Sequence, residues 1–229
     1  MRLVQLFLAG GWVMWPLLGC SLLAAGIIIE RLVNLRSARF LPPGLTTRIE
    51  TLVEAHAFSR ALQACREQPG VYTNLVRTAL EAGPAGRDAV RESIDAAGRR
   101  EIPRVGRYLG ALSTIVGVSP LLGLLGTVLG MVQVFGVVAA QGARQASSLS
   151  GGISVALLTT AFGLIIAIPS LVMYNVLNQR AEAIVLDIES RVLLLALRLF
   201  RPDGSPVIDG ASLVAVAKPA PASPATAGA

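Results

Sequence analysis

Charged and aromatic side chains are scarce in this sequence. Charged residues occupy 15% of the 229 positions and aromatic residues 5%, whereas 53% of the residues are hydrophobic. Soluble domains carry about 25% charged residues. The composition therefore excludes an ordinary soluble globule and favours a chain built largely for a lipid bilayer.

Groups that could bind metal or act as nucleophiles are also few. The one histidine, His56, has no second metal-ligand type nearby, and we expect a partly exposed helix residue. Cys20 lies in an apolar run and Cys65 in a charged segment, so we expect no disulfide between them. No nucleophile-base pair, metal-ligand spacing or phosphate-binding loop is found. The sequence predicts no enzyme, no cofactor and no metal site.

Three long stretches carry no charge at all: residues 3–29, 108–143 and 145–179. About 20 apolar residues in a helix cross the roughly 30 Å hydrocarbon core of a bilayer. We therefore predict an all-α membrane protein with three transmembrane helices, of which the second and third extend into a cytoplasmic helical bundle.

The basic residues indicate the orientation. Thirteen of the 20 lie in residues 31–107, five follow Tyr174, and only Arg144 lies between the second and third stretches. Because basic residues stay on the cytoplasmic side, the N-terminus is expected outside and the C-terminus in the cytoplasm. Acidic residues are interleaved with the arginines and no aromatic residues are set among them, so the net charge of +6 indicates topology and no nucleic-acid partner.

An apolar seam continues beyond the third span. It is made of six residues spaced three and four apart, which predicts a helix packed along that side: Ala181, Val185, Ile188, Val192, Leu195 and Leu199. Either the helix expected from residue 87 or another copy of the chain would cover this seam, and self-association is the simpler interpretation. The predicted segments are an N-terminal transmembrane helix (1–30), a cytoplasmic helical domain (31–107), transmembrane helix 2 (108–138), a short periplasmic loop (139–150), transmembrane helix 3 (151–179), its cytoplasmic extension (180–201) and a disordered tail (202–229).

The spans contain no Asp, Glu, Lys, Arg or His in their central parts, although a proton carrier normally keeps an ionisable side chain there. They carry instead small and hydroxyl-bearing residues at helical spacing. One interpretation is that these residues serve close helix packing. The other is that Thr127 and Thr160 line a passage into which another protein inserts a helix that carries an acid. The small residues expected to pack are Gly123, Gly126 and Gly130 in the second span, and Ala156, Gly163 and Ala167 in the third.

Two motifs carry a resemblance to a known family. Residues 120–131 read PLLGLLGTVLGM, and residues 152–169 read GISVALLTTAFGLIIAIP, followed by Tyr174 and Asn175. Together they resemble the two pore helices of the MotA/TolQ/ExbB proton-channel family, nearest to its ExbB/TolQ branch. The three-span layout with a large cytoplasmic segment extends the resemblance to most of the chain.

The resemblance implies a function and partners. Members form a homo-oligomeric ring, usually a pentamer, in the bacterial inner membrane around an ExbD/TolR-like single-span partner that supplies a membrane aspartate. The positions matching Thr127 and Thr160 supply hydroxyls, and proton flow moves the partner to energise transport or envelope maintenance. The sequence departs from the family at Val155, where ExbB and TolQ proteins commonly carry a glutamate. The alternative is a non-conducting membrane scaffold with stripes of small residues for packing.

Overall fold

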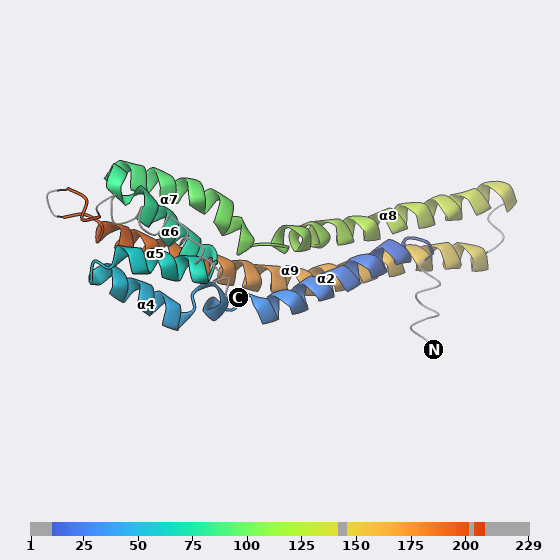
Figure 1. Cartoon of the computed structure of the whole chain (residues 1–229). Coiled ribbons are helices and arrows are strands. Elements are labelled where there is room, and N and C mark those ends of the chain that lie inside the picture. The colour runs from blue at the N-terminus through green and yellow to red at the C-terminus, as the bar shows by residue number, and fades with distance from the viewer. Residues whose placement is uncertain (1–10, 142–145, 202–203, 209–229) are drawn as a thin grey trace, which may run out of the picture. The chain divides into compact units, whose positions relative to one another are not determined.

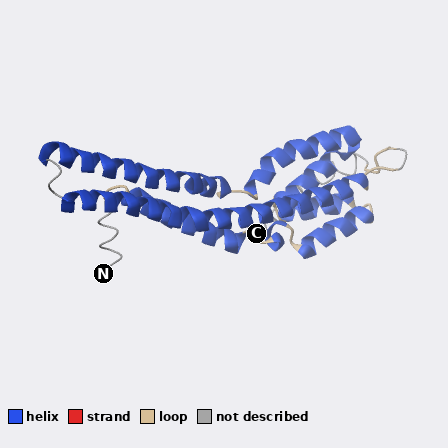
Figure 2. Ribbon diagram, turned by 180° about the vertical axis from the view of Figure 1, so that it is seen from behind, coloured by secondary structure: helices blue, strands red, loops and turns tan. Residues whose placement is uncertain are grey.

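The structure, a computed structural model, describes residues 11–141, 146–201 and 204–208. These residues form helices and no strand, in agreement with the predicted all-α class (Figures 1 and 2). Three of the helices, α2, α8 and α9, are long and apolar enough to cross a membrane. In chain order the elements are α2 (Met14–Asn34), α3 (Ser37–Phe40), α4 (Pro43–Glu54), α5 (Phe58–Glu67), α6 (Val71–Ala82), η1 (Gly83–Ala85), α7 (Arg87–Glu101), η2 (Ile102–Arg104), α8 (Leu109–Gln141) and α9 (Ala146–Leu197).

The chain divides into two compact units. The membrane unit comprises Met1–Leu35 and Gly106–Ala181, and the bundle unit comprises Arg36–Val105 and Glu182–Ala229. Helix α9 contributes its first part to the membrane unit and its last part to the bundle unit. The predicted continuation of the third span as one long helix is thus confirmed.

In the membrane unit, α2 packs against both other long helices. Met14 and Leu17 of α2 form a buried cluster with Val13, the residue just before the helix. Four partly buried residues pack against that cluster from α8 and α9: Leu122, Leu129, Phe162 and Ile166. Many other leucines and isoleucines of these helices remain exposed, as expected for side chains that face lipid.

The second span does not continue from the preceding charged helix. The sequence predicts a helix from about Arg87 into the second span with a kink at Pro103, but α7 ends at Glu101 and α8 begins at Leu109. Proline has no N–H to donate and clashes with the preceding turn. Tyr108, just before α8, has a left-handed φ of 67°. Its ring lies under the guanidinium groups of Arg31 and Arg107, at 5.3 and 4.7 Å from the ring centroid.

The bundle unit buries the apolar seam of α9 within the chain itself. Ile188, Val192 and Leu199 are fully buried there, and Figures 1 and 2 show the last part of α9 alongside the short helices. Arg191 of α9 bonds Glu50 of α4 at 3.2 Å and Asp187 of its own helix at 2.9 Å. The seam therefore does not need another copy of the chain to cover it, and the self-association interpretation of the seam was wrong.

The end of α9 is fixed by a short return of the chain. Phe200 and Pro206 form an isolated antiparallel bridge, and the Val207 N–H donates to the Leu199 carbonyl at 2.8 Å. Ile208 is buried, with its side chain against Gly83 of η1. Residues 204–208 of the expected tail are therefore packed, whereas residues 209–229 lie outside the described part of the chain.

Cys65 provides a built-in reporter for the bundle unit. Both cysteines are free thiols, and that of Cys65 is 2% exposed within the bundle. Burial raises the pKa of Cys65 from 9.0 to about 12, because it disfavours the charged thiolate. The thiolate is the reactive form. Alkylation at neutral pH is consequently slow until the bundle opens.

We expect Ile188→Ala, made in a Cys20→Ser background, to accelerate alkylation of Cys65 by about tenfold or more. Removing this fully buried side chain costs roughly 2–5 kcal/mol, which raises the population of the open bundle. The matched control is Leu186→Ala, because Leu186 lies two residues away on the same helix and is 65% exposed. Equal alkylation rates in the two variants, followed by mass spectrometry, would contradict the packing described above.

Candidate functional site

The second and third spans approach each other closely along a row of glycines on α8. A Cβ atom at Gly123 would lie 3.0 Å from the Thr160 Cα, and one at Gly126 would lie 2.5 Å from the Thr159 Cβ. One at Gly130 would lie 2.9 Å from the Ala156 Cβ. Only hydrogen fits at these positions, so the contact depends on the absence of side chains.

Helix α9 also contributes glycines that lie in close contact with α8. A Cβ at Gly163 would lie 2.7 Å from the carbonyl oxygen of Ser119, and one at Gly152 would collide with the Val134 side chain. Ala156 and Ala167 are both buried. The structure thus places all six small residues in buried positions of the membrane unit, five of them in direct apposition between α8 and α9.

Each of the two candidate threonines gives its hydroxyl proton to a backbone carbonyl. Thr160 Oγ1 donates across the interface to the Gly123 carbonyl at 3.1 Å, and Thr127 Oγ1 donates to the Leu124 carbonyl of its own helix at 2.7 Å. A hydroxyl oxygen also carries two lone pairs that accept hydrogen bonds. With their protons engaged, both side chains can present acceptor oxygens.

Thr127 and Thr160 lie on the same flank of the α8–α9 pair. Successive helix residues are rotated by about 100°, so Thr127 is about 140° from Leu122, which packs on α2. Thr160 is about 160° from Phe162, which packs on the same α2 cluster. Both threonines therefore point away from the side that α2 covers.

Val155 lies on the opposite side, next to the beginning of α2. It lines a cavity of about 160 Å³ together with Gln133 of α8 and Trp12. Val155 and Thr160 are five residues apart, or about 140° around α9. The position where the sequence departs from the family pattern is therefore not on the threonine flank.

Sequence reasoning missed Thr159 and Gly152 at this interface. Thr159 is fully buried, and its hydroxyl donates to the Ala156 carbonyl at 2.8 Å. Its Cβ and methyl group pack directly against Gly126. Its spacing from Ala156 and Gly163, three and four residues, was a signal that it shares their helix face. The neighbouring Thr160 drew the functional assignment instead.

Comparison with known proteins gives consistent matches. Residues 53–190 match the model of the MotA/TolQ/ExbB proton channel family. The putative biopolymer transport protein ExbB-like 3 of Synechocystis sp. is 38% identical over 189 residues, covering 74% of this chain and 81% of the relative. The biopolymer transport protein ExbB of Salmonella typhimurium is 35% identical over 126 residues, 52% of each chain. The Tol-Pal system protein TolQ of Haemophilus influenzae is 40% identical over 90 residues, 38% of this chain and 39% of the relative.

The close contact at Gly126 leads to a specific prediction. Gly126→Ala should lower the thermal stability of the membrane unit, because the new methyl group meets Thr159 at its Cβ and that atom cannot move without its backbone. Gly136→Ala, on the same helix with nothing within 4 Å, should be neutral or stabilising by up to about 1 kcal/mol.

Thermal unfolding in detergent, followed by the fluorescence of Trp12 and Trp15, measures both variants. The double variant Gly126→Ala/Thr159→Ala should recover part of the loss, because the second change removes the atoms that the first one meets. A melting temperature lowered equally by Gly126→Ala and Gly136→Ala would mean that the two helices do not meet at this glycine.

Proposed function

The chain belongs to the MotA/TolQ/ExbB proton channel family, and from this membership we propose that it is the ring-forming subunit of an inner-membrane proton channel. The channel couples the proton-motive force to motion of an ExbD/TolR-like partner and so energises transport or envelope maintenance. The family is one of membrane channels and not of enzymes. Whichever process the channel and its moving partner energise, this chain forms the wall of the proton path.

The proposal assigns a topology and an assembly to the chain. The N-terminus is periplasmic and the C-terminus cytoplasmic, so that residues 31–107, with 13 of the 20 basic residues, stay inside. Several copies, five in the family pattern, surround the partner's single-span helices. Each copy would turn one flank of its α8–α9 pair toward the centre.

One observation carries the proposal: Thr127 and Thr160 lie on a common flank that α2 leaves uncovered. No Asp, Glu, Lys, Arg or His occurs between residues 108 and 143 or between 145 and 179. A proton relay in this membrane needs a titratable group, and an acid on an inserted helix supplies it. The flank offers that acid two hydroxyl oxygens without the cost of a buried charge.

The hydroxyl geometry favours one protonation state of the partner's acid. Both threonines donate to backbone carbonyls, so toward the passage they act as acceptors. An acceptor stabilises a protonated carboxyl group or a water molecule, both of which have an O–H to donate. The ring wall would therefore hold the neutral acid, and deprotonation would release it.

A membrane scaffold without conduction is the alternative, and the tight glycine contacts favour it as much as they favour a channel. The two differ in what the hydroxyls do. In a scaffold, Thr127 and Thr160 serve only packing and the Thr160–Gly123 hydrogen bond, and no acidic partner is required. Val155 does not separate them, because it lies beside α2 and not on the threonine flank.

Thr160→Val separates the two functions, because it keeps the side-chain shape and deletes the hydroxyl. In cells that co-express an ExbD/TolR-like partner, we expect proton-dependent output to fall by about tenfold or more, the size of effect that one well-placed polar contact has in a dry site. Thr160→Ser, which restores a hydroxyl, should recover most of the output.

Thr114→Val is the matched control. Thr114 lies on the exposed side of α8, and its hydroxyl donates to the Gly110 carbonyl at 3.0 Å. All variants are first compared for assembled protein in the membrane. Normal output in Thr160→Val, with normal assembly, would favour the scaffold.

A further inference from the structure

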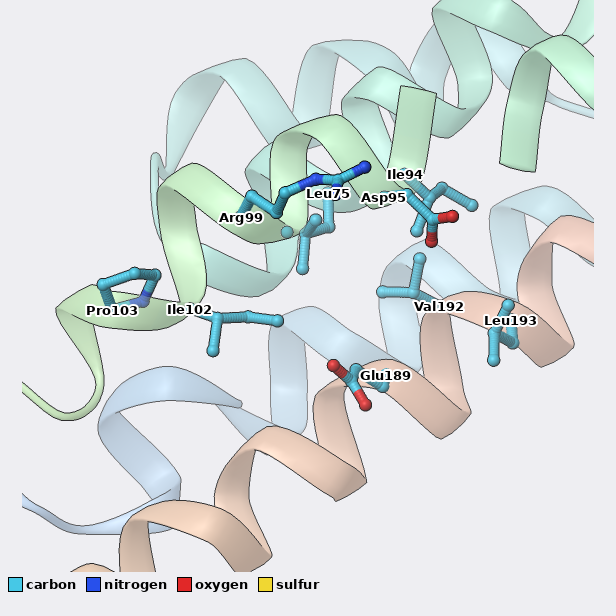
Figure 3. A pocket seen from close by; sticks show the side chains of 10 residues that line it. Leu75, Ile94, Asp95, Arg99, Ile102, Pro103, Glu189, Val192 and Leu193 are labelled. Atoms are coloured by element: carbon cyan, nitrogen blue, oxygen red, sulfur yellow. The ribbon is translucent and has the colours of Figure 1, made fainter. Parts of the chain in front are cut away.

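An apolar groove opens in the bundle unit between α7 and α9. Its volume is about 560 Å³, within the range of ligand sites in proteins. Leu75 and Val192 form its buried floor, and Ile94, Ile102 and Leu193 line its sides. Figure 3 shows α7 with η2 as one wall and α9 as the other. This groove takes no part in the function proposed above.

Three charged side chains surround the groove. Asp95 and Arg99 extend from α7, and Glu189 extends from α9 on the other side (Figure 3). Among the described residues, none of the three has an ion-pair partner, although seven ion pairs are formed elsewhere. The rim thus has one basic and two acidic groups, so it suits an occupant with an apolar stretch next to one positive charge.

The chain itself contains such a segment beyond the described residues. Residues 213–217 read LVAVA, and Lys218 follows directly. Lys218 is the only lysine in the sequence, since the other 19 basic residues are arginines. Asp209 is the only acidic residue from 209 onward. The apolar stretch matches the groove floor, and the ammonium group matches the two rim carboxylates.

The segment also starts within reach of the groove. The last described residue, Ile208, packs against Gly83, four residues before α7 begins. Ile94 and Gly98 of the groove lie seven and eleven residues into α7, or about 10 and 16 Å along its axis. An extended chain spans about 16–18 Å from residue 208 to 213 and about 33–36 Å to residue 218. Both the apolar stretch 213–217 and Lys218 can therefore reach the groove of the same molecule.

We propose that residues 213–218 of the chain dock into the α7–α9 groove of the same molecule, with the LVAVA stretch on its apolar floor and the Lys218 ammonium between Asp95 and Glu189. Docking covers Leu193, which is otherwise 52% exposed, and neutralises the net negative rim.

A zero-length cross-link tests the docking directly. A water-soluble carbodiimide joins a lysine amine to a carboxylate only when the two are in contact, and this chain offers one lysine. We expect peptide mass spectrometry of the full-length protein in detergent to find Lys218 joined to Glu189 or Asp95. Absence of both products, or coupling of Lys218 only to acids outside the groove, overturns the proposal.

Two adjacent leucines give a matched pair of variants. Leu193 lines the groove, whereas Leu194 lines a different hollow with Glu50 and Arg198 and is 61% exposed. Leu193→Gln should reduce the cross-link by about tenfold, the effect expected for losing a buried leucine contact, and Leu194→Gln should leave it unchanged. Equal yields in the two variants contradict docking on this floor. Cys65 alkylation verifies that both variants keep the bundle closed.

Co-expression of two chains distinguishes the molecule's own segment from that of a neighbour. One chain carries Lys218→Arg, and the other carries Asp95→Asn with Glu189→Gln, so that neither chain can form the product alone. We expect no cross-link between them. A product in this mixture would mean that another copy fills the groove, and would overturn docking within one molecule.

Discussion

The membrane unit depends on the direct approach of two backbones, α8 and α9, with nothing larger than hydrogen between them at Gly123 and Gly163. In lipid, helices gain little from burying apolar surface, so packing contact and interhelical hydrogen bonds must hold them together. The Thr160 hydroxyl can reach the Gly123 carbonyl only because that approach is close. The same approach fixes the rotation of both helices and thereby which flank carries the hydroxyls.

Much of this arrangement could be predicted from the sequence, because two simple periodicities specify it. Uncharged stretches of sufficient length identify the three spans, and small residues at intervals of three and four identify the faces that meet. Thr127 and Thr160 stood out because they lie beside or within the stripes of small residues and match the hydroxyl positions of the family that the motifs resemble. Thr159 did not stand out, because a buried threonine that packs against a glycine of the neighbouring helix has the same sequence spacing as any other packing residue.

The parts that could not be predicted depend on which element covers which face. Periodicity shows that the Ile188 side of α9 is apolar, but it does not say that the same chain buries that side or that Arg191 pairs with Glu50 of α4, 141 positions away. Nor does it reveal local backbone reversals. His56, expected in a helix, has a left-handed φ of 54° between α4 and α5, and Tyr108 has one of 67° before α8. Nonglycine residues adopt such angles where surrounding packing imposes them.

The contact between Gly126 and the Thr159 side chain limits which substitutions the two positions can accept. A larger residue at position 126 is tolerated only together with a smaller one at position 159, because the two share one volume. A change of residue size at position 126 or 159 during evolution therefore requires either a paired substitution or a destabilised single variant as an intermediate. At the adjacent Thr160 only backbone atoms meet Gly123, so a substitution there is limited not by volume but by the loss of the hydroxyl that bonds the Gly123 carbonyl.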